Sequence, residues 1–169
     1  MHQDIMNDNI AQTFLYEASG LETMVAELYM LFERSFPEDY DFWHQLALEE
    51  KNHATLIRAI QDNPNWSNQF VSSFAPDLLR EVKEVKKWLS SVIAGFSEEK
   101  PDRKTAFLTA LKVEKSAGEI DYQNVMTQNS DSWILKGLQN INKYDRDHIN
   151  RLKRYMEEKK IICSGSDLI

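Results

Sequence analysis

The stretch LALEEKNHATLIRAI, residues 46–60, contains an acid and a histidine in the pattern Glu-x-x-His. Side chains three and four positions apart are neighbours on a helix, so Glu50 and His53 would share a face with Ile57 and Ile60. A carboxylate and an imidazole would then point into a hydrophobic core, where a charge is costly to bury unless a partner compensates it. The pattern therefore predicts that a partner inside the core compensates these two polar side chains.

The same pattern recurs near the carboxyl end of the chain. Asp145 and His148 have the spacing of Glu50 and His53, with Asp in place of Glu. They interrupt an otherwise hydrophobic or aromatic stripe that consists of Ile134, Leu138, Ile141, Asp145, His148, Leu152 and Tyr155. Its alternating steps of four and three residues are typical of the buried face of a helix. Two helices are therefore predicted to bury an acid and an imidazole one turn apart.

Two further predicted helices each carry one acid in a hydrophobic stripe. The first stripe is Leu15, Ala18, Glu22, Val25, Tyr29 and Phe32. The second is Phe107, Ala110, Leu111, Glu114, Ala117 and Gly118. Together with the two histidine motifs, they form a weak internal repeat, in which a helix with one acid is followed by a helix with acid-x-x-His.

The composition indicates an ordered acidic protein. The chain of 169 residues is predicted to form a single domain over 1–169, with a flexible tail from about residue 161. The net charge of −7 argues against nucleic acid and anionic membranes as partners, because both bind clustered positive charge. The amino-terminal residues lack the features of a signal peptide and no segment has the length of a membrane span, so we expect a cytoplasmic protein. Because Cys163 is the only cysteine, any electron donor must be a separate protein.

Helical periodicity recurs along the chain, and strand-like alternation does not. Five helices are predicted, over about 9–35, from Pro37 to about 61, 76–95, 101–128 and about 130–160. Short connections make the first two helices, and the last two, antiparallel hairpins. The segment between the hairpins is long enough to cross a bundle from end to end. The predicted fold is all-α, a four-helix bundle of two antiparallel hairpins with one long, helix-containing crossover.

Four buried carboxylates and two imidazoles indicate a site for two metal ions. Each buried carboxylate costs several kcal/mol unless it is compensated, and neutral imidazoles do not compensate it. Two divalent cations would balance the four negative charges. This charge balance suits two iron ions that react with dioxygen or peroxide, and it leaves manganese and zinc open.

The ligand pattern resembles that of the ferritin-like di-iron carboxylate proteins. It consists of Glu22, Glu50-x-x-His53, Glu114 and Asp145-x-x-His148. The phrase LETMVAELYMLF at 21–32, followed by LALEEKNHATL at 46–56, is most similar to the rubrerythrin branch of that superfamily. The resemblance covers roughly 10–60 and 101–160. It implies a ferritin-like bundle that holds a pair of iron ions.

The resemblance also implies a role for each ligand. The bridging carboxylates would be Glu50 and Asp145, the terminal imidazoles His53 and His148, and the terminal chelating carboxylates Glu22 and Glu114. Asp145 is one methylene shorter than the usual Glu, which would weaken or displace one metal. Ala117 stands where many rubrerythrins have a further Glu, which puts their redox-dependent ligand exchange in doubt, and the rubredoxin module with its paired cysteines is absent.

Two functional classes follow from this site. The first is a di-iron oxidoreductase that reduces peroxide or dioxygen with electrons from an external rubredoxin-like or flavoprotein donor. The alternative is an iron-binding, ferroxidase-type iron-handling protein without a dedicated organic substrate. A metal-stabilised scaffold without turnover is a third, weaker hypothesis. The sequence leaves open the native metal and whether the chain forms a homodimer.

Four further side chains near the motifs are interpreted from their positions on the helices. Glu49 falls off the buried stripe and is predicted to be a surface charge, while His44 is predicted to be structural. Tyr29 and Asp121 follow Glu22 and Glu114 by two helical turns. We favour core packing for Tyr29 and a surface position for Asp121, with orientation of a metal-binding histidine as the alternative for both.

Overall fold

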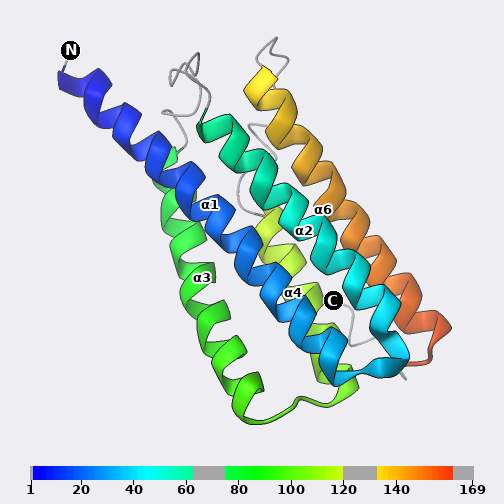
Figure 1. The fold of residues 1–169 in the computed structure, drawn as a ribbon. Helices are drawn as coiled ribbons and strands as arrows, with labels where there is room; N and C mark the ends of the chain where they lie inside the picture. The colour runs from blue at the N-terminus through cyan, green and yellow to red at the C-terminus, as the bar shows by residue number, and fades with distance from the viewer. Residues whose placement is uncertain (1, 63–74, 120–132, 162–169) are drawn as a thin grey trace.

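The computed structural model describes residues 2–62, 75–119 and 133–161. Within these ranges the regular elements are five α-helices and one 3-10 helix, with no β-strand, which confirms the all-α prediction (Figure 1). The elements are α1 (His2–Ser35), η1 (Pro37–Asp39), α2 (Tyr40–Gln61), α3 (Ala75–Glu98), α4 (Arg103–Glu119) and α6 (Trp133–Glu158). None of the described helices is both long and apolar enough to cross a bilayer.

The helix boundaries differ from the predicted ones at four places. The helix α1 begins at His2, whereas the prediction placed its start at about residue 9. The predicted second helix begins as the separate turn η1, where Pro37 occupies the first turn and acids follow it. The helix α3 continues through Gly95 to Glu98, because one glycine costs a helix only about 1 kcal/mol. The predicted fourth helix is described as far as Glu119, and the rest of its predicted span lies outside the described residues.

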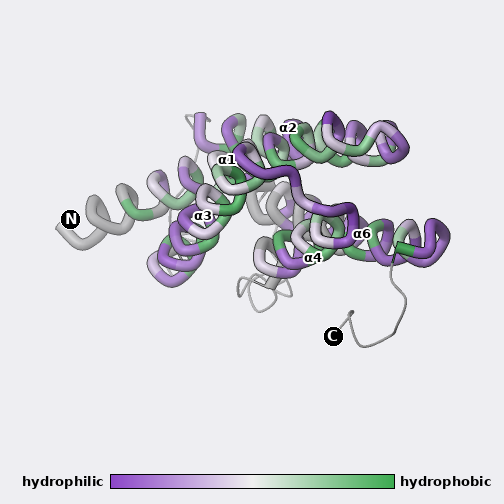
Figure 2. The backbone as a smooth tube through the Cα atoms, turned by 90° about the horizontal axis from the view of Figure 1, so that it is seen from below, coloured by the Kyte–Doolittle hydropathy of each residue, from purple (hydrophilic) through white to green (hydrophobic). Residues whose placement is uncertain are grey.

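The helices pack in two adjacent pairs with α3 against the first pair. In Figure 1, α1 and α2 lie side by side and run in opposite directions, and α4 and α6 do the same. In the view from below of Figure 2, α1 lies between α2 and α3, and the packing contacts agree, because α1 contacts both of them. Contacts between α2 and α6 join the two pairs. The first acid-bearing helix and both histidine-bearing helices therefore come together along the chain's interior.

The predicted stripes of α1 and α2 form much of the core. On α2, Glu50, His53, Ile57 and Ile60 are buried as predicted, and Trp43 and Leu46 are buried with them. Trp43 is the centre of an aromatic cluster, with ring centroids 4.4 Å from Phe107, 5.0 Å from Phe32 and 5.6 Å from Tyr29. Tyr29 of this cluster also contacts Glu114, so the cluster lies beside one of the predicted ligands.

A buried polar contact fastens η1 to α4 and α6. The Asp39 side chain is fully buried, and Arg103 donates to both of its oxygens, from Nε at 2.7 Å and from Nη2 at 2.6 Å. Tyr155 Oη donates to Asp39 Oδ1 at 2.9 Å. Burial and the Asp39 contact raise the pKa of Tyr155 to about 12. The connection between the first two long helices is thus held to the other helix pair by charge-assisted hydrogen bonds.

Candidate metal centre

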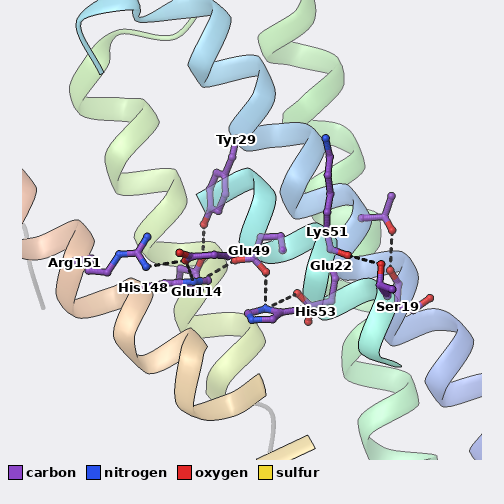
Figure 3. A network of polar contacts seen from close by, with 12 residues as sticks. Ser19, Glu22, Tyr29, Glu49, Lys51, His53, Glu114, His148 and Arg151 are labelled. Atoms are coloured by element: carbon purple, nitrogen blue, oxygen red, sulfur yellow. Dashed lines mark hydrogen bonds and ion pairs between the residues drawn. The ribbon is translucent and has the colours of Figure 1, made fainter. Parts of the chain in front are cut away.

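Five of the six predicted ligands converge in the interior from four different helices (Figure 3). Each of two groups of three offers ligand atoms that lie within 4.8 Å of one another. The first group, called the Glu22 cluster, consists of Glu22, Glu50 and His53. The second, called the Glu114 cluster, consists of Glu50, Glu114 and His148. Both groups could hold a metal ion.

Glu50 belongs to both clusters and presents one oxygen to each. Its Oε2 lies 3.1 Å from His53 Nδ1, and its Oε1 lies 2.8 Å from His148 Nδ1. The two imidazole rings are nearly parallel, with centroids 5.6 Å apart and an interplanar angle of 19°. A carboxylate with one oxygen toward each of two facing imidazoles has the arrangement of a bridging ligand between two metal positions.

The outer acids complete the two clusters. Glu22 Oε2 lies 3.8 Å from His53 Nδ1, and Glu114 Oε2 lies 3.4 Å from His148 Nδ1. Each histidine therefore turns the same ring nitrogen, Nδ1, toward two carboxylates. The predicted i, i+3 geometry explains this for Glu50 and His53, because three residues of helix bring their side chains to one face.

The acids and the histidines of the site shift one another's pKa values. Burial works to lower the pKa of His53, but contacts with Glu22 and Glu50 outweigh burial and raise it to about 10. Burial opposes the charged form of His148 as well, yet contacts with Glu114, Glu49 and Glu50 raise its pKa far above the ordinary value. Burial and the nearby charge of Glu50 raise the pKa of Glu114. Without metal, protonated histidines therefore supply the positive charge that the acids require.

Glu49 is not the free surface charge that its position on the helix predicted. His148 Nε2 lies 2.8 Å from Glu49 Oε2, and Arg151 Nη1 donates to the same oxygen at 2.7 Å. Burial works to raise the pKa of Glu49, but the hydrogen bonds with His148 and Arg151 lower it to about 2. The prediction failed because Glu49 leaves the stripe of α2 on the side that faces α6, a neighbour that helical periodicity alone does not reveal. The feature of the sequence that could have indicated this contact is Arg151, a positive charge one helical turn after His148.

Tyr29 has a polar role in addition to the packing role that we favoured. Its ring lies in the aromatic cluster, and its hydroxyl donates to Glu114 Oε1 (Figure 3). The alternative hypothesis was therefore right that Tyr29 reaches the site, although its partner is the carboxylate of Glu114 and not a histidine.

Two buried atoms of the Glu114 cluster indicate that a cation fits between its side chains. Glu50 Oε1 and His148 Nδ1 have no hydrogen-bond partner within the part of the chain that the structure describes. They lie 2.8 Å apart, but their relative orientation is not that of a hydrogen bond. In the metal-free site the two atoms therefore meet as an ion pair without hydrogen-bond geometry, and a cation that displaces the His148 proton would bind both of them. The donor set of carboxylate oxygens and imidazole nitrogens fits a transition metal ion.

Three further residues named in the sequence analysis lie wholly or in part outside the described residues, and His44 has contacts of its own. Asp145 is in α6, three residues before His148, but its side chain lies outside the described residues. Asp121 and the side chain of Ala117 also lie outside them. His44 is 45% exposed, lies 3.4 Å from Glu33 and stacks on Tyr40, so it is placed away from the site.

Comparison with known proteins adds no relative to these observations. No model of a protein family, no curated protein and no solved structure matches this chain. The geometry of the two clusters is therefore the support for a metal centre.

Proposed function

We propose that this protein is a ferritin-like di-iron carboxylate oxidoreductase of the rubrerythrin-like kind, which reduces peroxide or dioxygen with electrons from an external donor. The observation that carries the proposal is the pair of buried clusters that share Glu50. Two adjacent positions with carboxylate and imidazole ligands suit a pair of redox-active ions, which together supply two electrons to an oxidant.

The proposed architecture is a ferritin-like four-helix bundle of α1, α2, α4 and α6. The antiparallel pairing of α1 with α2 and of α4 with α6, together with the contact between α2 and α6, supports it. In this arrangement α3 belongs to the long connection between the two hairpins. Each bundle helix contributes at least one ligand, as in bundles that build metal sites from facing helices.

The chain's own residues would hold, shield and orient the ions. Glu50 would bridge them, and Glu22, His53, Glu114 and His148 would bind at the two ends. We propose Asp145 as the remaining ligand, on the strength of its spacing to His148. Close packing around Glu50 and Glu114 excludes bulk water, which strengthens electrostatic interactions inside the site.

The test is stopped-flow mixing of anaerobic protein, loaded with ferrous iron, with an equimolar amount of peroxide per site. The protein should be oxidised stoichiometrically and faster than free ferrous iron. Glu114→Ala and His148→Ala should lose this rapid phase, whereas Glu27→Ala, on the exposed face of α1, should keep it. Turnover should require an added rubredoxin-like or flavoprotein donor. If the protein reacts no faster than free iron, or if both site variants match the parent, the oxidoreductase proposal fails and the iron-handling alternative replaces it.

Metal binding should release protons at neutral pH. A metal needs the lone pair of His53 Nδ1, but the pKa of this group in the metal-free protein is about 10, so it carries a proton at neutral pH. The metal must displace that proton, and raising the pH therefore favours binding. Affinity should increase about tenfold per pH unit for each displaced proton until the pH approaches the histidine pKa. Calorimetric titration with zinc in two buffers of different ionisation enthalpy would count the protons, and identical heats in both buffers would contradict this expectation.

A further inference from the structure

The two clusters differ in how completely the protein encloses them. In the Glu114 cluster the side chains of His148, Glu50 and Glu114 are 1%, 2% and 3% exposed. In the Glu22 cluster the Glu22 side chain is 12% exposed. A metal position lined by the more buried ligands exchanges less readily with solvent and experiences a stronger field from its carboxylates.

The Glu114 cluster also receives support from residues that are not ligands. Glu49 on α2 faces His148 Nε2, while Arg151 on α6 and Gln45 on α2 donate to Glu49 at 2.7 and 3.0 Å. Because Nε2 is directed at Glu49, the opposite ring nitrogen, Nδ1, is turned toward Glu50 and Glu114. Tyr29 fixes Glu114 in the same way through its hydroxyl. A ligand whose orientation is set before the metal arrives loses less freedom on binding.

Three buried side-chain atoms lack a hydrogen-bond partner within the described ranges; one is Trp43 Nε1, and the other two, Glu50 Oε1 and His148 Nδ1, belong to the Glu114 cluster. A metal ion bound there would satisfy both of them. Enclosure, fixed orientation and unsatisfied ligand atoms therefore coincide at one of the two positions.

Resting on the proposed function, we propose that Glu49 is a positioning residue for His148 that makes the Glu114 cluster the tighter of two unequal metal positions. The carboxylate of Glu49 accepts the Nε2 proton of His148 and so keeps Nδ1 directed at Glu50 and Glu114, where an arriving metal displaces the Nδ1 proton. The Glu22 cluster, with its more exposed acid, is the weaker and more exchangeable position. Loading is then sequential, first at the Glu114 cluster and then at the Glu22 cluster.

The test is calorimetric titration of the full chain with Co²⁺, combined with visible absorption of the bound ion. The parent protein should show two classes of site. Glu49→Ala should weaken the tighter class by about 10- to 100-fold and leave the weaker class in place, because partners that orient a metal-binding histidine have effects of this size. Glu22→Ala should remove the weaker class alone. Glu27→Ala, which removes an exposed acid from α1, serves as the matched control and should change neither class.

Glu49→Gln separates positioning from a general loss of structure. The glutamine carbonyl can still accept the His148 Nε2 proton, so this variant should recover most of the affinity that Glu49→Ala loses. Nitrogen-15 spectra of the zinc-loaded protein should show His148 with a protonated Nε2 and a metal-bound Nδ1. Glu49→Ala should change this pattern. The chain contains four histidines, which makes that assignment tractable with a His148→Ala reference.

The outcomes distinguish this inference from the function on which it rests. If the parent binds two ions but Glu49→Ala leaves both classes unchanged or weakens them equally, the inference is overturned and the metal site stands. If Glu22→Ala removes the tighter class, the order of the two positions is wrong. If the parent binds no Co²⁺, both the inference and the proposed function fail.

Discussion

Replacing Arg103 with methionine is expected to lower the free energy of unfolding by about 3–5 kcal/mol, the loss typical when a buried charge is left without its partner. The Asp39 side chain is fully buried and receives two hydrogen bonds from Arg103. Methionine retains much of the aliphatic bulk but neither donor, so a buried carboxylate would remain with the Tyr155 hydroxyl as its described donor. Urea unfolding followed by circular dichroism would measure the change.

Two companion variants show whether the buried charge causes the loss. Glu38 lies next to Asp39 and 4.0 Å from Arg103 Nε, but its side chain is 56% exposed. Glu38→Gln should therefore change the unfolding free energy by less than about 1 kcal/mol. Adding Asp39→Asn to Arg103→Met should recover part of the loss, because the uncompensated charge is then gone. A double variant less stable than Arg103→Met alone would contradict this explanation.

The helices and most of the site were predictable because both depend on local spacing. Hydrophobic residues at steps of three and four predicted the buried faces, and the interruptions of those faces predicted Glu22, Glu50, His53, Glu114 and His148 as inward-pointing. All five are buried or nearly so. Metal binding by these residues stays a prediction, and so does the identity of the metal, because carboxylate and imidazole ligands are shared by several transition metals.

The residues that escaped prediction make contacts between helices far apart in the sequence. Glu49 contacts Arg151 and His148 where α2 packs on α6. Asp39 in η1 contacts Arg103 of α4 and Tyr155 of α6. Periodicity describes one helix at a time and says which face is buried. It does not say which neighbour covers the edge of that face, and that neighbour decides whether a polar residue there is solvated or paired.

Replacing Glu50 with alanine is expected to abolish tight binding of both metal ions, because Glu50 belongs to both clusters and has one oxygen toward each histidine. The parent should bind two ions per chain after anaerobic loading with ferrous iron, as counted by elemental analysis of desalted protein. A ligand present at about 100 times its dissociation constant stabilises the folded state by roughly 2.7 kcal/mol. The melting temperature of the parent should therefore rise with metal, and that of Glu50→Ala should not.

His53→Ala separates the loss of a shared ligand from the loss of any ligand. His53 belongs to the Glu22 cluster and not to the Glu114 cluster, so this variant should still bind one ion and retain part of the thermal shift. Retention of two ions by Glu50→Ala would show that the clusters do not share a ligand. Loss of both ions from His53→Ala would show that the two positions fill only together. The expected series of two, one and no ions follows from a single geometric fact, that the two oxygens of Glu50 face different imidazoles.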